Sequence, residues 1–123
     1  MNRKFYFDTY AIIEIGKGNK NYEDYAGNVQ MVLNKLNLLE LAYFLLREGR
    51  EEEVQEMFDK YSKFHIEYSN HDLILAAFMK FKLRKKQISF VDCIGYILAK
   101  KHHAKFLTGD EHFRNMENVE FVK

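Results

Sequence analysis

The feature that most constrains the fold is the alternation of short apolar segments with longer segments of helical periodicity. Strand-like segments are predicted at residues 4–7, 29–33, 64–68, 105–108 and 120–122. Helices are predicted at residues 37–46, 51–61, 70–86 and 89–102, with shorter helical turns at 9–16, at 22–27 and after Asp110. Strands that alternate with helices over this length predict a mainly parallel sheet with helices on both faces, a three-layer α/β/α fold.

The length and composition predict one domain over residues 1–123. At 47% hydrophobic residues the chain can bury a real core, and it contains no proline, repeat or low-complexity tract that marks a linker. No apolar run is long enough to cross a bilayer, and the first five residues lack the apolar stretch of a signal peptide, so we expect a cytoplasmic protein. The single cysteine, Cys93, cannot form an internal disulfide.

Two aspartates come directly after predicted strands. Asp8 follows the first strand, and Asp110 follows the strand that ends at Thr108. Parallel α/β sheets bind their ligands beyond the carboxyl ends of the strands. We therefore expect both carboxylates to point into the same crevice.

Two further acids stand near predicted helix starts. Asn37 precedes Glu40 by three positions, and Ser89 precedes Asp92 by the same distance, which is the spacing of a capping box. For either pair alone, a purely structural role is the better explanation. With Asp8 and Asp110, however, four acids fall at strand ends or helix starts, which favours a common site.

The chain resembles PIN domains, especially the VapC-type toxins of prokaryotic toxin-antitoxin pairs. The resemblance covers almost the whole chain and lies in residues 7–9 (Phe-Asp-Thr), 37–41 (Asn-Leu-Leu-Glu-Leu), 89–92 (Ser-Phe-Val-Asp) and 106–113 (Phe-Leu-Thr-Gly-Asp-Glu-His-Phe). The last two segments are the most specific. The resemblance implies a metal-dependent endoribonuclease, with Mg²⁺ or Mn²⁺ held by catalytic carboxylates at Asp8, Glu40, Asp92 and Asp110.

The resemblance also implies an RNA substrate and an antitoxin protein as partner, and we expect a homodimer. Asn37 stands where many relatives have threonine, but asparagine caps a helix at least as well. Relatives differ in whether a further acid joins the site, and Glu111, Glu117 and Asn115 remain open candidates. The number of metal ions, one or two, is also open.

Four carboxylates in one place repel one another unless protons or cations neutralise them. Ligands that are all oxygen atoms favour a hard ion, and Mg²⁺ keeps several of its waters when a few carboxylates bind it. If four of the 18 acidic residues gather there, the other 14 face 19 Lys and Arg, so the rest of the surface carries about +5. A basic surface around an acidic site is suited to binding the phosphates of RNA.

Other residues are predicted around the acids. Thr9, Thr108 and His112 are candidates to orient the neighbouring carboxylates, while Arg47 and Lys100 share helix faces with Glu40 and Asp92 and are candidates to bind RNA phosphates. The other histidines do not have zinc-site spacing.

Two alternatives to an endoribonuclease remain. One is a nuclease that acts on DNA or in RNA maturation. The other is a catalytically silent module that binds RNA or protein and uses the four acids only as helix caps and surface charge.

Overall fold

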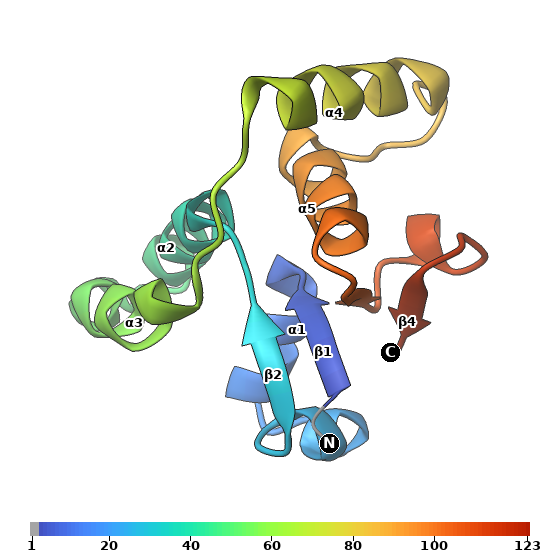
Figure 1. The fold of residues 1–123 in the computed structure, drawn as a ribbon. Coiled ribbons are helices and arrows are strands. Elements are labelled where there is room, and N and C mark those ends of the chain that lie inside the picture. The colour runs from blue at the N-terminus through green and yellow to red at the C-terminus, as the bar shows by residue number, and fades with distance from the viewer. Residues whose placement is uncertain (1–2) are drawn as a thin grey trace.

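The computed structural model describes residues 3–123, and its centre is a four-stranded sheet in which every strand is parallel to its neighbours (Figure 1). The strands are β1 (Arg3–Phe7), β2 (Val29–Val32), β3 (Lys105–Thr108) and β4 (Val119–Phe121), in the spatial order β2-β1-β3-β4. The predicted parallel sheet is therefore confirmed. Residues 1 and 2, part of the predicted domain and of the segment considered for a signal peptide, lie outside the described residues.

Helices connect the strands. They are α1 (Thr9–Gly16), α2 (Lys35–Arg47), α3 (Val54–Tyr61), α4 (Asn70–Lys82) and α5 (Phe90–Lys101). Short 3-10 helices lie at Lys20–Tyr25, Glu51–Glu53, Ser62–Phe64 and Glu111–Phe113. Within residues 3–123, no helix combines the length and apolar character that a membrane span requires.

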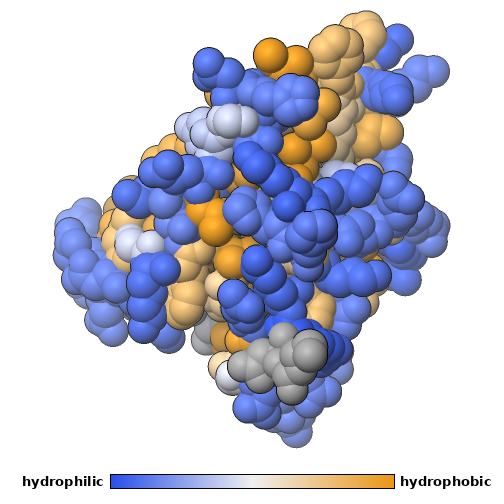
Figure 2. Space-filling model, in the orientation of Figure 1, coloured by the Kyte–Doolittle hydropathy of each residue, from blue (hydrophilic) through white to orange (hydrophobic). Residues whose placement is uncertain are grey.

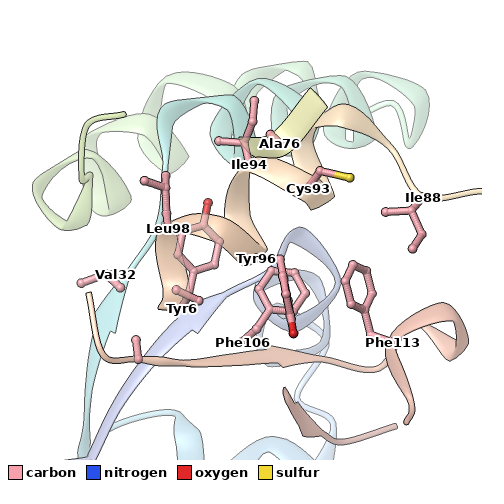
Figure 3. Packing of buried hydrophobic residues seen from close by; sticks show 12 residues of the cluster. Tyr6, Val32, Ala76, Ile88, Cys93, Ile94, Tyr96, Leu98, Phe106 and Phe113 are labelled. Atoms are coloured by element: carbon pink, nitrogen blue, oxygen red, sulfur yellow. The ribbon is translucent and has the colours of Figure 1, made fainter. Parts of the chain in front are cut away.

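The sheet has an apolar core on each face, because side chains of a strand alternate between the two faces. Phe5 and Phe7 of β1 pack with α1, α2 and α3, while Tyr6 packs with α5 and with Phe106 of β3. The rings of Tyr6 and Phe106 are stacked at 5.8 Å between centroids, and Figure 3 shows them beside Tyr96 of α5. These two cores make the predicted three-layer α/β/α arrangement.

A glycine inside α5 lets this helix approach the sheet closely. A Cβ atom added at Gly95 would stand 2.8 Å from Cε1 of Tyr6 and 3.1 Å from Cε1 of Phe106. The helix therefore accepts a residue of poor helical propensity in exchange for contact with two aromatic rings. The same contact holds the amino-terminal end of α5 over the sheet, where Asp92 lies.

The structure corrects two predictions about secondary structure. Residues 64–68 do not form a strand: His65 makes a single bridge to Leu33 just beyond β2, because the chain leaves α3 through a 3-10 helix and touches the sheet edge only once. Asn37 does not begin its helix either. Asn34 caps α2, its side chain accepting from the backbone N–H of Leu36, and Asn37 is the third residue of the helix.

Candidate functional site

Asp8 lies between β1 and α1, at the carboxyl end of the sheet. Its backbone N–H donates to the carbonyl of Leu107 at 3.1 Å, which continues the pairing of β1 with β3. Its side chain is only 3% exposed, and Oδ2 accepts a hydrogen bond of 2.7 Å from Oγ1 of Thr108. Thr108, expected to orient a carboxylate adjacent to it in the chain, thus also contacts Asp8 across two strands.

Asp110 follows β3 and is held by local contacts. Its N–H donates to Oγ1 of Thr108 at 3.1 Å, and its Oδ1 accepts from the backbone N–H of His112 at 3.0 Å. The ring Nδ1 of His112 lies 2.9 Å from the same oxygen. A glycine is required between Thr108 and Asp110, because a Cβ atom added at Gly109 would stand 2.5 Å from the carbonyl oxygen of Val122.

Glu40 is oriented by a chain of hydrogen bonds that starts in the core. The hydroxyl of Tyr6 donates to Oδ1 of Asn37 at 2.5 Å, and Nδ2 of Asn37 donates to Oγ1 of Thr9 at 3.0 Å. Oγ1 of Thr9 then donates to Oε1 of Glu40 at 2.6 Å. Asn37 also accepts from the N–H of Asn34, so it closes the capping box of α2. Glu40 is therefore not part of a capping box, contrary to the prediction.

Asp92 has the capping contacts that its sequence predicts. Its Oδ2 accepts from the N–H of Ser89 at 3.0 Å, and its own N–H donates to Oγ of Ser89 at 3.0 Å. One oxygen of Asp92 thus has a structural role at the start of α5. The same carboxylate nevertheless faces the other acids, so the structural role does not exclude a functional one.

All four predicted acids line one cavity of about 540 Å³, which we call the acid cavity. Asp8 and Asp110 reach it from strand ends, Glu40 from α2 and Asp92 from α5. Its wall also contains Thr9, Tyr10, Tyr43, Arg47, Glu111 and Lys123. The structure therefore brings the four predicted acids together, and their role as metal ligands stays a prediction.

Lys100 lies elsewhere. It lines a separate cavity with Arg3, Lys4 and Lys105, and its Nζ lies 2.8 Å from Oε1 of Glu117. The expected position of Lys100 on the rim of the acidic site is therefore not what the structure shows, because the far end of α5 lies away from Asp92. Binding of RNA by Lys100 stays a prediction.

Of the two acids considered for a fifth position, only Glu111 lines the acid cavity. Its carboxylate contacts Arg114 at 2.8 Å and the ammonium of Lys123. The guanidinium of Arg114 and then the charge of Lys123 lower the pKa of Glu111 to about 2. Glu111 is therefore an ion-paired side chain at the mouth of the cavity, whereas Glu117 pairs with Lys100 outside it.

Burial and mutual repulsion raise the pKa values of three of the four acids. Burial raises the pKa of Asp8 well above its ordinary value, and the nearby charge of Asp92 raises it further. Burial, followed by the charge of Asp92, also raises the pKa of Glu40. For Asp92, burial outweighs the hydrogen bonds from Ser89, and the charge of Asp110 adds to the upward shift.

A divalent cation fits this chemistry. The four carboxylates supply the oxygen ligands that Mg²⁺ and Mn²⁺ accept, and their mutual repulsion favours a cation between them. Among residues 3–123, no three acidic, histidine or cysteine side chains stand close enough together to hold a metal ion by themselves. Mg²⁺ does not need three such side chains, because one or two carboxylates, several waters and substrate phosphate complete its shell.

The sequence did not predict the site residues whose hydrogen bonds join segments far apart in the chain. The sequence predicts a strand at Tyr6 and a helix start at Asn37, within residues 37–41, but neither pattern predicts the chain of hydrogen bonds that ends at Glu40. Tyr43 also lines the acid cavity. Its signal in the sequence was its position on the same helical face as Glu40 and Arg47.

The family described as PIN domain matches residues 5–119 of this chain. Among solved structures, a toxin-antitoxin complex from Klebsiella pneumoniae is similar with a TM-score of 0.71 and 15% identity, over 94% of this chain and 95% of that one. VapBC2 from Rickettsia felis, bound to a DNA fragment from its promoter, has a TM-score of 0.70 and 19% identity, over 98% and 99% of the two chains.

FitAcB from Neisseria gonorrhoeae has a TM-score of 0.70 and 16% identity, over 97% of this chain and 96% of that one. At these identities the likeness shows a common fold. No curated protein matches the chain closely enough to count as a relative.

The raised pKa of Asp8 predicts how stability depends on pH without metal. Because folded Asp8 holds its proton more tightly than the unfolded chain does, its contribution to stability falls as pH rises from about 3.8 through the raised folded pKa. Asp8→Asn should therefore melt above the parent at neutral pH in chelator. The gap should shrink as the pH is lowered, as followed by thermal melts.

Glu117→Gln is the matched control for this measurement. The ion pair with Lys100 lowers the pKa of Glu117, so this exposed carboxylate stabilises the fold above its unfolded pKa and loses that effect as pH falls. Removing it should not raise the melting temperature at neutral pH. A parent that melts above Asp8→Asn throughout the pH range would show that repulsion in the acid cavity is unimportant.

Proposed function

The chain belongs to the PIN domain family, a family of nucleases, and we propose that it is a metal-dependent endoribonuclease that hydrolyses RNA phosphodiester bonds. The observation that carries this proposal is the gathering of four carboxylates in one cavity. They come from two strand ends and two helices that are up to 102 positions apart in the chain, and they are Asp8, Glu40, Asp92 and Asp110.

These carboxylates are the proposed ligands of one or two Mg²⁺ or Mn²⁺ ions. Such an ion, when bound, would stabilise negative charge at the scissile phosphate and activate water for its hydrolysis. The chain's own residues orient the ligands: Thr108 holds Asp8, Thr9 holds Glu40 and His112 holds Asp110. Hydrogen bonds of this kind fix the direction in which a carboxylate presents its oxygens, so we assign these three residues a positioning role.

The proposal predicts that labelled RNA is cut in Mg²⁺ or Mn²⁺ and not in excess chelator. Asp8→Asn and Asp110→Asn should each lower the rate at least as much as loss of an outer ligand contact does, about 10- to 100-fold. Glu117→Gln, an acid outside the acid cavity, should cut normally. Labelled DNA of the same sequence separates an RNA nuclease from a DNA nuclease.

Full cleavage in chelator would exclude the metal mechanism, and cleavage of DNA alone would favour the alternative nuclease. A protein that binds RNA without cutting it in either ion would support the silent binding module instead.

We also infer that the chain is the toxin of a toxin-antitoxin pair and acts in the cytoplasm. Family membership supports this inference, as does the likeness in fold to a structure named as a toxin-antitoxin complex and to VapBC2, whose name matches the VapC resemblance. A cleft between α1, α2 and α3 suits a partner segment. Apolar residues line its floor and charged residues its rim; among them are Ile12, Leu41, Met57, Lys17, Arg50, Glu56 and Lys60.

Growth experiments test the partner cleft. Expression of the chain alone should arrest growth, and co-expression of its antitoxin should relieve the arrest. Gly16 lines the cleft and an added Cβ meets nothing within 4 Å, so Gly16→Trp should fill the cleft, abolish relief and keep RNA cleavage. Gly27→Trp, equally open but outside the cleft, should still be relieved. Relief of both variants would place the antitoxin elsewhere.

The expected homodimer has a suitable surface on α4. Ile74, Phe78 and Phe81 repeat at helical spacing and are 53%, 68% and 64% exposed. Figure 2 shows hydrophobic residues gathered at the end of the molecule where Figure 1 places α4. Apolar surface of this kind on a folded protein marks an interaction site. We assign it to a second copy of the chain, related by a two-fold axis.

Phe78→Glu should convert the dimer to a monomer in sedimentation experiments, because two carboxylates would meet at the interface. Because Phe78 is exposed, the substitution should cost the fold little stability. Tyr68→Glu, at an exposed aromatic residue outside α4, is the control and should remain dimeric. A parent that sediments as a monomer at micromolar concentration would contradict the assignment.

A further inference from the structure

An exposed aromatic ring lies at the edge of the acid cavity. Tyr43 on α2 is 64% exposed, yet it lines the cavity together with Glu40. Cζ of Arg47 lies 5.0 Å from the centre of the Tyr43 ring. The ring therefore contributes little to the core of the protein, while its position brings it next to the carboxylates.

The spacing along α2 suits a nucleic-acid strand. Glu40, Tyr43 and Arg47 are separated by three and four positions, so they lie along one helical face. At a rise of about 1.5 Å per residue, Arg47 lies roughly 10 Å along the helix from Glu40. That length corresponds to about three stacked nucleotides at roughly 3.4 Å each.

The charge of Arg47 is available to a ligand. Lys123, the other cation on the cavity wall, is paired with Glu111. In the described part of the chain, no carboxylate lies within ion-pair distance of Arg47. A guanidinium in this situation can bind a phosphate without first breaking a salt bridge.

We propose that Tyr43 and Arg47 form a nucleotide subsite, in which an unpaired base of the RNA stacks on Tyr43 while Arg47 binds an adjacent phosphate. Arg47 covers one face of the ring and the base takes the other. The proposal rests on the proposed ribonuclease function and adds a substrate preference to it. A base inside a duplex is already stacked on its neighbours, so the subsite selects RNA that is unpaired beside the cleaved bond.

A protein partner is the competing occupant of this surface. Leu39 and Leu46 flank Tyr43 on α2 and are 61% and 50% exposed. Those two leucines are not among the residues that line the acid cavity, whereas Tyr43 and Arg47 are. The ring of Tyr43, the unpaired charge of Arg47 and the adjacent carboxylates suit a nucleotide better than they suit an apolar helix of a protein partner.

Cleavage kinetics test the subsite with two RNAs of one sequence, one single-stranded and one annealed to its complement. The parent should prefer the single strand. Tyr43→Leu should raise KM for the single strand about 5- to 150-fold, the range expected for one lost stacking contact, with kcat nearly unchanged. Tyr43→Phe keeps the ring and should behave as the parent. Tyr68→Leu removes an exposed tyrosine outside the acid cavity and should also behave as the parent.

A second measurement reads stacking without cleavage. The fluorescence of single-stranded RNA that carries the base 2-aminopurine should be quenched when the RNA binds the metal-free parent or Tyr43→Phe, but not when it binds Tyr43→Leu. Arg47→Ala should reduce the salt dependence of this binding by a slope of about one, as expected for one lost phosphate contact, and Lys82→Ala should not.

The outcomes separate this proposal from the ribonuclease function. Cleavage of single and double strands with equal KM in the parent and Tyr43→Leu overturns the subsite and leaves the ribonuclease intact. If quenching is lost in Tyr43→Leu and no RNA is cut by the parent, the subsite is supported and the ribonuclease function is overturned. If Tyr43→Leu instead loses only the relief of growth arrest by the antitoxin, the ring belongs to a protein interface and the subsite is wrong.

Discussion

The parallel pairing of β1 with β3 is the contact on which the acid cavity depends. It joins segments that are 100 residues apart and brings Asp8 within 2.7 Å of Oγ1 of Thr108. Thr108 also accepts from the backbone N–H of Asp110, so one hydroxyl connects the carboxylate of Asp8 to the backbone of Asp110. If the register shifted by one residue, the side chains of β3 would exchange faces and this connection would be lost.

The fold holds these like charges together by hydrogen bonds from uncharged groups. Thr108, Thr9 and the backbone N–H of Ser89 each reach one carboxylate, but none of them neutralises it. The raised pKa values of Asp8 and Glu40 are the remaining cost of burial and repulsion. A cation that entered such a site would stabilise the folded domain by binding to it.

Of the three exposed surfaces with proposed partners, two adjoin on α2, because Ile13 and Phe44 line both the acid cavity and the cleft, and the third lies apart on α4. Tyr43 and Arg47 face the acid cavity from α2, the cleft lies between α1, α2 and α3, and the apolar surface belongs to α4. Because α4 packs on α5 rather than on the sheet, its outer face stays open without exposing the core. A second copy of the chain on α4 therefore need not compete with RNA or an antitoxin, whereas the proposed surfaces of these two partners adjoin on α2.

The sequence by itself determined the features that depend on neighbouring residues. The alternation of strands and helices, the acids after β1 and β3, and the capping contacts between Ser89 and Asp92 all follow from spacings of a few residues. Only the tertiary structure decided which distant groups meet. The path from Tyr6 through Asn37 to Glu40, and the pairing of Lys100 with Glu117 away from the acids, join residues 17 to 31 positions apart. Local patterns cannot specify such contacts, because the packing of helices on the sheet sets the distances between them.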